Sequence, residues 1–236
     1  MNSLENCFDD LNIRLDDNKI KKFEGYMEAI LEKNKFVNLT AITDRDEFIK
    51  KHFIDSLLCA ASEEFIQAKS VIDVGTGGGF PGVPLAIAFP DKEFVLIDSL
   101  NKRIRIIDEI CQMLSITNVR AVHGRAEELA RRKEFRESFD VCVSRAVANM
   151  STLSEYCLPF VKVGGTFIAY KGPDCGEEMK QAANAISILG GQLVRIDKPE
   201  LKNQPFEHTL IYIRKDVNTV SKYPRKAGTP SKEPIK

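Results

Sequence analysis

Residues 71–82, VIDVGTGGGFPG, decide how the rest of this sequence is read. An apolar run with β propensity leads directly into a cluster of glycines, and a short helix-forming stretch, PGVPLAIAF, follows. Glycine permits the positive φ angles of a tight turn, and its missing side chain lets a ligand approach the backbone. In open α/β sheets, nucleotides bind in the crevice at the carboxyl end of such a strand, where the next helix offers free N–H groups. The segment therefore predicts a nucleotide-type binding site.

Two classes of ligand fit a glycine loop of this kind. Gly77, Gly79 and Gly82 satisfy the G-x-G-x-x-G pattern of dinucleotide enzymes, but the pattern starts two residues late. Gly75 follows the strand directly, with Asp73 two residues before it, and this D-x-G-x-G-x-G arrangement is typical of methyltransferases. The register therefore favours S-adenosylmethionine as the cofactor. A nicotinamide-dependent oxidoreductase remains the alternative, and a tight turn that binds no ligand is the third possibility.

Beyond residue 70, short β-rich runs alternate with helical stretches along the chain. This alternation predicts a parallel sheet with helices on both faces. The last two β-rich runs, QLVRIDK and HTLIYIRK, have no helix between them, so we expect one of them to be antiparallel. Residues 67–215 are thus predicted to form a Rossmann-like α/β domain of the class I methyltransferase type, with a seven-stranded, mostly parallel sheet.

The segments on either side of this domain have a different character. Residues 1–66 are predicted to form an N-terminal helical cap. Apolar residues recur there at helical spacing: Ile20, Phe23, Met27 and Ile30. Thr43 and Asp46 resemble a capping box that would open a second helix over residues 46–61. Residues 216–236 are rich in Pro, Lys and Gly with few apolar residues, so we expect a flexible basic tail.

Composition excludes several classes of function. Thirty-four basic residues balance 34 acidic ones, so any binding of nucleic acid must use local patches and not bulk charge. No apolar run approaches the roughly 20 residues that span a bilayer. The six cysteines are scattered without a C-x-x-C pair, which argues against a zinc site or a disulfide framework. We therefore expect a cytoplasmic, metal-free protein that does not bind membranes and is monomeric.

Further candidate site residues follow the later strands. Asp98 ends the second strand, where a carboxylate can accept hydrogen bonds from ribose hydroxyls, although it could instead cap the next helix. Ala126 and Glu127 follow the third strand and could read the adenine edge, although a glutamate in a first helical turn also suits the helix dipole. Arg145 closes the fourth strand, where a structural ion pair and a ligand contact are equally compatible with its spacing. Lys171 follows the fifth strand as a candidate phosphate or guanine O6 contact, or as a solvated lysine.

Three polar residues of the predicted cap share one helical face. His52, Asp55 and Ser56 lie at i, i+3 and i+4. That face could look onto the mouth of the active site. The interpretation we favour is a local hydrogen-bond network that locks the cap onto the sheet.

Several stretches in order resemble one family, the bacterial 16S rRNA guanine-N7 methyltransferases, also called the glucose-inhibited division protein B family. They are NLTAIT (38–43), HFIDSL (52–57), DVGTGGGFPGVPLAI (73–87), LIDSLNKR (96–103), SRAVA (144–148), YKG (170–172) and the ending YPRKAGTPSKEP. The resemblance implies methyl transfer from S-adenosylmethionine to N7 of a guanine in the decoding-region loop of 16S rRNA. By motif it implies cofactor contacts from Gly75, Phe80, Ala126, Glu127 and Arg145; Gly77 and Asp98 are added from the loop and the second strand.

The implied chemistry needs no catalytic acid or base. Guanine N7 carries a lone pair and no proton, so positioning suffices, with Arg145 and Lys171 as candidate substrate contacts. The partner would be 16S rRNA or the small ribosomal subunit; a methyltransferase of another RNA, or a non-enzymatic RNA-binding protein, are the alternatives. Candidate phosphate contacts are Lys102, Arg103, Arg105, residues 131–133 and, in the tail, Lys222, Arg225 and Lys226.

Overall fold

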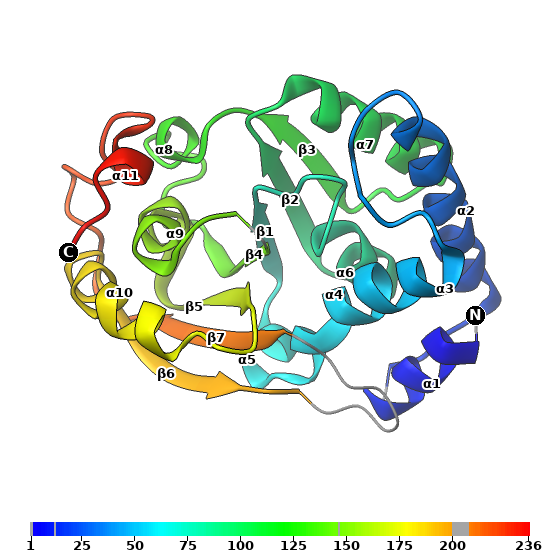
Figure 1. Ribbon diagram of the computed structural model, residues 1–236, viewed down its shortest axis with the longest axis horizontal. Helices are drawn as coiled ribbons and strands as arrows, with labels where there is room; N and C mark the ends of the chain where they lie inside the picture. The colour runs from blue at the N-terminus through cyan, green and yellow to red at the C-terminus, as the bar shows by residue number, and fades with distance from the viewer. Residues whose placement is uncertain (1, 12, 146, 200–207) are drawn as a thin grey trace.

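A seven-stranded sheet forms the centre of the molecule in a computed structural model, which describes residues 2–11, 13–145, 147–199 and 208–236 (Figure 1). The strands are β1 Ser70–Val74, β2 Glu93–Asp98, β3 Val119–His123, β4 Phe139–Arg145, β5 Val161–Lys171, β6 Gly191–Asp197 and β7 Thr209–Lys215. Their order is β3-β2-β1-β4-β5-β7-β6. Strands β1 to β5 pair in parallel, whereas β7 runs antiparallel to both β5 and β6. The predicted α/β class and the antiparallel strand near the end are confirmed.

Helices cover both faces of this sheet because its strands alternate buried residues between two cores. Along β1, Val71 belongs to one core, whereas Ile72 and Val74 belong to the other. The first core packs against α1 to α7, and the second against α8 to α10. The helices are α1 Asn2–Asp10, α2 Asp17–Asn34, α3 Arg45–Phe48, α4 Asp55–Leu57, α5 Glu63–Gln67, α6 Gly82–Ala88, α7 Asn101–Met113, α8 Ala126–Leu129, α9 Met150–Cys157, α10 Gly176–Ile188 and α11 Thr229–Lys232.

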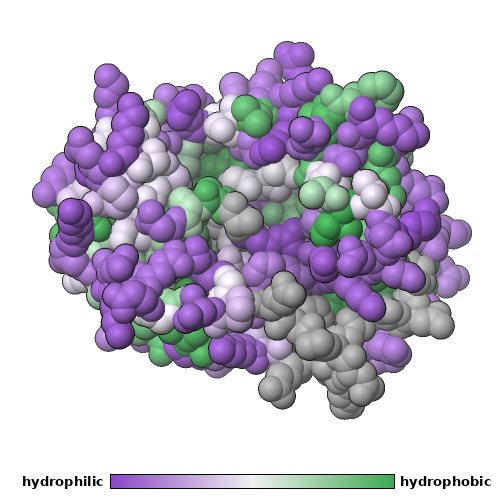
Figure 2. Space-filling model, viewed as in Figure 1, coloured by the Kyte–Doolittle hydropathy of each residue, from purple (hydrophilic) through white to green (hydrophobic). Residues whose placement is uncertain are grey.

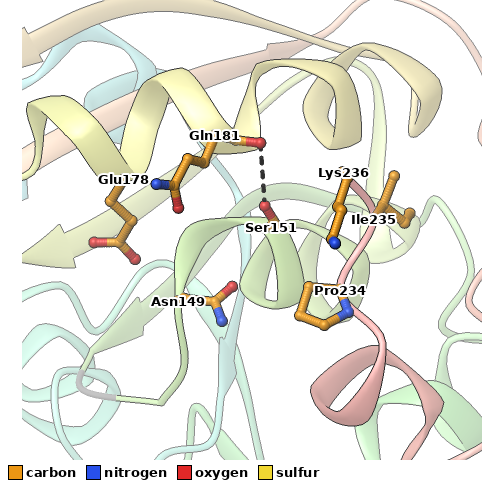
Figure 3. Close-up of a pocket in the computed structure, with 7 residues that line it drawn as sticks. All are labelled: Asn149, Ser151, Glu178, Gln181, Pro234, Ile235 and Lys236. Atoms are coloured by element: carbon orange, nitrogen blue, oxygen red, sulfur yellow. Dashed lines mark hydrogen bonds between the residues drawn. The ribbon is translucent and has the colours of Figure 1, made fainter.

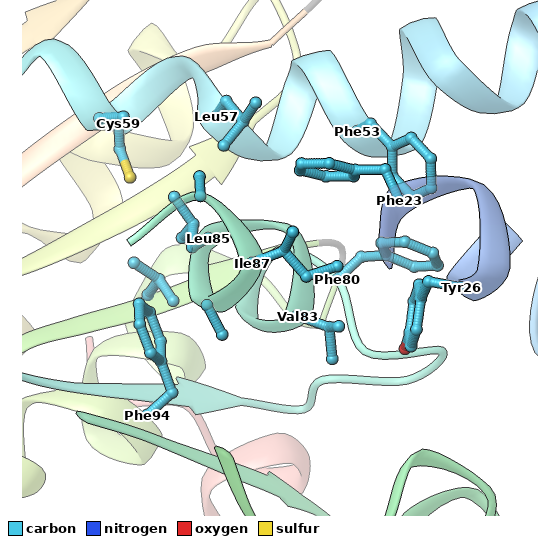
Figure 4. Packing of buried hydrophobic residues seen from close by; sticks show 14 of the residues in the cluster. Phe23, Tyr26, Phe53, Leu57, Cys59, Phe80, Val83, Leu85, Ile87 and Phe94 are labelled. Atoms are coloured by element: carbon cyan, nitrogen blue, oxygen red, sulfur yellow. The ribbon is translucent and has the colours of Figure 1, made fainter. Parts of the chain in front are cut away.

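The predicted N-terminal cap consists of α1 to α5, and it packs over the glycine loop and α6. Figure 4 shows Phe23 and Phe53 of the cap beside Phe80 of the loop. The rings of Phe23 and Phe53 meet edge to face with their centroids 4.9 Å apart. Full burial of each such ring contributes roughly 1.5–3 kcal/mol. The cap is therefore joined to the sheet by one continuous apolar core.

The second helix of the cap begins differently from the prediction. Asp44, not Thr43, is the N-cap residue, and its carboxylate accepts the Glu47 backbone N–H at 2.9 Å. The pair that fits the capping box is therefore Asp44 with Glu47. Aspartate is at least as good an N-cap residue as threonine, and glutamate is preferred three residues after the N-cap. The predicted helix is also not a uniform α-helix, because Ile49–Ile54 forms a π-helical segment.

The prediction of a flexible tail is wrong, because residues 216–236 pack against α8 and α9. Tyr223 is buried, and Arg225 forms a bidentate ion pair with Glu155, whose side chain is 0% exposed. The Pro230 carbonyl accepts the Thr152 hydroxyl at 2.9 Å. The prediction from composition counted only the apolar residues of the tail. Polar contacts with buried residues of α9, Glu155 and Thr152, also hold the tail in place.

Three further findings limit the possible functions. Across the part of the chain that is described, no helix combines the length and the hydropathy needed to cross a membrane. All six cysteines are buried and free, as expected for small apolar residues. Among the same described residues, no three or more His, Cys, Asp or Glu side chains are grouped so that they could hold a metal ion.

Candidate functional site

The glycine loop leaves the carboxyl end of β1 and is held in shape by Asp73. The Asp73 Oδ2 atom accepts the Thr76 hydroxyl at 2.7 Å and the Gly82 N–H at 2.9 Å. Gly75 and Gly77 have φ angles of +75° and +60°, which an L side chain adopts only with strain. Among the residues that the structure describes, the buried Oδ1 atom of Asp73 has no hydrogen-bond partner. The loop is therefore tied down on one oxygen of a carboxylate whose other oxygen stays unpaired.

The loop has a packed side and an open side. A Cβ atom built on Gly79 would lie 2.0 Å from the Tyr26 hydroxyl, so this glycine allows the cap to approach. Within the described part of the chain, a Cβ atom built on Gly77 would meet nothing closer than the Gly75 carbonyl oxygen at 4.0 Å. The Gly77 N–H donates to Asp98 Oδ2 at 3.0 Å. The space over Gly77, bordered by Asp98, is thus where a ligand can approach the backbone.

Two cap residues support the loop from its packed side. The Tyr26 hydroxyl donates to the Gly78 carbonyl at 2.8 Å, and the His52 ring stacks on the Phe80 ring at 4.2 Å. Sequence reasoning missed Tyr26, whereas it had named His52 as part of a network that locks the cap onto the sheet. Tyr26 lies among apolar residues at helical spacing and looks like any core residue. Phe80, predicted to contact the cofactor, has its side chain buried in this interface, so such a contact would come from its backbone and stays a prediction.

Three carboxylates of the candidate site are buried: Asp73 is bonded to the glycine loop from beneath, Asp98 borders its open side, and Glu127 is the second residue of α8. Asp73, Asp98 and Glu127 are all 5% exposed or less. Burial raises the pKa of Asp73 to about 6, although hydrogen bonds from Thr76 and Gly82 oppose the shift. Concentrated negative charge favours a cationic ligand and disfavours an anionic pyrophosphate. The electrostatics therefore favour S-adenosylmethionine, which carries a sulfonium and an ammonium group, over a dinucleotide.

Asp98 and Glu127 are each held by a backbone N–H. Asp98 Oδ1 accepts the Leu100 N–H at 2.8 Å in addition to the Gly77 contact, so it orders both the loop and the start of α7. Glu127 Oε1 accepts the Gly228 N–H of the tail at 2.8 Å. Ala126 is the first residue of α8. Their contacts to ribose and adenine stay predictions.

Arg145 lies in a buried network between β4 and the cap. Its side chain is 8% exposed and forms an ion pair with Asp55 at 2.5 Å. It also donates to the Lys51 carbonyl at 3.0 Å and to His52 Nδ1 at 3.1 Å. The second oxygen of Asp55 contacts Nδ1 of His208, the residue before β7, at 2.5 Å. Arg145 thus forms the structural ion pair, and a contact to cofactor or substrate stays a prediction; Ala146 of the same motif lies outside the described residues.

The network supports the interpretation that His52, Asp55 and Ser56 lock the cap onto the sheet. The Ser56 hydroxyl donates to the His52 carbonyl, and the Ser56 carbonyl accepts the Tyr170 hydroxyl of β5 at 2.7 Å. His52 Nε2 lies 2.6 Å from the Thr40 hydroxyl. One cap segment is therefore bonded to the N-terminal loop, β4, β5 and the residue that precedes β7.

Comparison with known proteins decides the family. A family model described as GidB, rRNA small subunit methyltransferase G, matches residues 19–206. The chain belongs to this family. A Clostridium tetani protein named ribosomal RNA small subunit methyltransferase G is 48% identical over 99% of this chain and 98% of its own length. A Clostridium novyi protein of the same name is also 48% identical, over the full length of both chains.

Solved structures agree on the fold. An O-methyltransferase from Bacillus cereus in complex with SAH shares 14% sequence identity with this chain and aligns with a TM-score of 0.55, over 80% of this chain and 90% of its own. Membership in the GidB family confirms the predicted resemblance and makes the protein an S-adenosylmethionine-dependent methyltransferase. The nicotinamide-dependent oxidoreductase alternative is thereby wrong.

Lys171 of this GidB-family protein is paired and not solvated. Its ammonium lies 2.7 Å from Glu178 and donates to the Ala148 carbonyl at 3.0 Å. Glu178 also lines a cavity of about 500 Å³ between α9, α10 and the end of the tail (Figure 3). None of the residues that line this cavity belongs to the predicted cofactor set. A substrate contact by Lys171 stays a prediction and would require exchange of Glu178 for the substrate.

The protonation of His52 gives the GidB-family protein a testable pH dependence. Burial and then the charge of Arg145 lower the pKa of His52 to about 3 from 6.5, although Asp55 opposes the shift. Below about pH 6.5 the His52 side chain takes up a proton in the unfolded chain but not in the folded protein. The contribution of neutral His52 to the free energy of unfolding is therefore complete above pH 6.5 and is lost as the pH falls towards 3. The slope is at most about 1.4 kcal/mol per pH unit.

We expect the difference in unfolding free energy between the wild type and His52→Gln to shrink as the pH falls from about 7 to about 5. Urea unfolding at each pH measures it. Asp73, whose pKa is raised by folding, changes the stability of both proteins with pH in the opposite direction. Subtracting one free energy of unfolding from the other removes this common contribution and leaves that of His52. A difference that stays constant with pH would contradict the neutral His52.

Proposed function

We propose that this protein transfers the methyl group of S-adenosylmethionine to N7 of a guanine in the decoding-region loop of 16S rRNA, as a cytoplasmic, metal-free monomer. The observation that carries the proposal is the open side of the glycine loop, where the backbone of Gly77 is accessible beside buried carboxylates. Membership in the GidB family supports an rRNA substrate.

The residues around the loop fit the cofactor. Gly75 and Gly77 would hold the methionine portion, and the negative charge of Asp73 beneath them suits its ammonium and sulfonium groups. Asp98 would accept the ribose hydroxyls, since its carboxylate already borders the open space. Ala126 and Glu127 would face the adenine. When bound, S-adenosylmethionine supplies an electrophilic methyl group on a positively charged sulfur.

The chemistry asks the protein for positioning and for exclusion of water. Guanine N7 has no proton to lose, so no side chain has to act as a base. Val147 covers the start of the loop, because a Cβ atom on Gly75 would lie 2.5 Å from Val147 Cγ2. This apolar side chain is itself 38% exposed, so the bound substrate would have to complete the exclusion of water from the face of the loop. Lys171, in exchange for Glu178, would donate to guanine O6 and orient N7.

Transfer of a labelled methyl group tests the proposal. We expect incorporation into naked 16S rRNA or into small ribosomal subunits, and not into total tRNA. A methyl group on N7 makes the base labile to reduction and aniline scission, so chain cleavage identifies both the atom and the nucleotide. Incorporation into tRNA alone would favour a methyltransferase of another RNA. No incorporation into any of these RNAs would leave the non-enzymatic alternative.

A further inference from the structure

Seven exposed cations lie on two segments that are far apart in the sequence. They come from the residues flanking α8 and from the tail, and we call them the tail–α8 surface: Arg125, Arg131, Arg132, Lys133, Lys222, Lys226 and Lys232. Sequence reasoning treated the two segments as separate candidates. The fold makes them one surface, since α11 lies beside α8 and over α9 (Figure 1).

Hydrogen bonds hold the two segments together. The Arg131 guanidinium donates to the Lys222 carbonyl at 3.2 Å and to the Pro224 carbonyl at 2.5 Å. Gly228 is bonded to Glu127 of α8, and Arg225 to Glu155 of α9. The cations are therefore displayed on a backbone that is already ordered, so a ligand does not have to order the tail in order to bind it.

The positive charge of this surface is not neutralised internally. Within the described residues, no carboxylate lies within 4.0 Å of any of the seven side-chain cations, whereas Arg195, Lys162 and Arg45 elsewhere on the surface are paired with carboxylates. Arg131 bonds carbonyl oxygens, which are neutral. The same two segments expose four acidic side chains, Glu128, Glu134, Asp216 and Glu233, and one further cation, Lys236, at the far end of the tail. On a chain with no net charge, this is a local excess of positive charge.

The surface borders the candidate cofactor site. Arg125 is the N-cap residue of α8, and Glu127, two residues later, is the candidate adenine contact. Figure 2 shows hydrophilic side chains projecting over α8 and α11, next to the hollow at the centre of this face. A polyanion that lies on the seven cations would therefore pass beside this central hollow.

We propose that the tail–α8 surface binds the phosphates of the rRNA strand that flanks the methylated guanine. The proposal rests on the function proposed above. Arginine and lysine side chains spread along an ordered surface match the repeated charges of an RNA backbone, and each neutralised phosphate releases counterions. Phosphate contacts fix the register of the strand and carry no base specificity. The surface would thus hold the strand while the guanine enters the central hollow.

The test is a triple variant, Arg132→Ala, Lys222→Ala and Lys226→Ala, which spares Arg131 and Arg225 because these two anchor the tail. A matched control removes three exposed lysines elsewhere: Lys21→Ala, Lys69→Ala and Lys180→Ala. Binding of 16S rRNA is measured by filter retention at several salt concentrations. We expect the first triple to weaken binding at least about tenfold and to reduce the salt slope by roughly 2–3, and the control to change neither.

Two further measurements keep the outcome decisive. Thermal midpoint and affinity for S-adenosylhomocysteine should match the wild type in both triples, which shows that the tail is still packed. Equal losses in both triples, or no loss in the first, would overturn the proposal, as would a loss of binding to anionic lipid vesicles with rRNA binding intact. Failure of the proposed function would appear separately, as a wild-type protein that methylates no rRNA.

Discussion

Gly77→Ala is expected to lower the affinity for S-adenosylmethionine at least about tenfold, about 1.4 kcal/mol, while the protein still folds. The new methyl group has room within the protein, since its nearest neighbour is 4.0 Å away. It would project into the space where the cofactor approaches the backbone. Titration calorimetry with S-adenosylmethionine or S-adenosylhomocysteine measures the loss, and methyl transfer to rRNA should fall with it.

Gly164→Ala is the matched control for backbone strain. Gly164 has a φ of +85° and no atom within 4 Å of a Cβ, so alanine there meets the same kind of penalty, roughly 1–2 kcal/mol, within β5. Both variants should therefore lose similar stability, and only Gly77→Ala should lose cofactor affinity. Unchanged affinity in Gly77→Ala would mean that the cofactor does not use the open side of the loop.

Arg145→Ala is expected to destabilise the fold by about 3–5 kcal/mol. The Asp55 carboxylate, 3% exposed, would lose its arginine partner and keep a contact to His208. At roughly 2–4 °C per kcal/mol for a chain of this size, the thermal midpoint should fall by about 6–20 °C. Urea unfolding and thermal melts measure the change, and Arg145→Lys should recover part of it.

An exposed arginine pair provides the comparison. Arg214 is paired with Asp216, and both side chains are more than a third exposed. Arg214→Ala should cost no more than about 1 kcal/mol, because water screens the pair. If Arg145→Ala cost as little, Arg145 would not be holding the cap onto the sheet, and its role as a ligand contact would gain support from any loss of cofactor affinity.

The architecture could be predicted from the sequence because each helix and strand produces a local pattern of apolar and polar residues. Alternating β-rich and helical runs gave the parallel sheet, and the spacing of Phe23, Met27 and Ile30 gave the main helix of the cap. The glycine loop predicted the site, because a turn that needs positive φ angles requires glycine at fixed positions. Each of these signals spans fewer than about 20 residues.

Apart from the start and the π-helical turn of the second cap helix, what the sequence left wrong or open depended on contacts between residues far apart in the sequence. The tail looked unable to order itself, but Arg225 meets Glu155, which is 70 residues earlier. Arg145 could be a ligand contact or an ion pair until Asp55, 90 residues earlier, proved to be its partner. The local sequence does not show whether a carboxylate will form an ion pair with a distant arginine or face solvent.

The hydrogen bond between Glu127 and Gly228 also sets an order of events during translation. The two residues are 101 positions apart. A ribosome that has completed the sheet has already released the glycine loop, Asp98 and Glu127, but not the N–H group that holds the Glu127 carboxylate. The part of the candidate site at Glu127 therefore acquires its final geometry only after the tail has been synthesised and has folded back over α8. A nascent chain that stalls before Gly228 would carry the whole glycine loop and still lack a finished site.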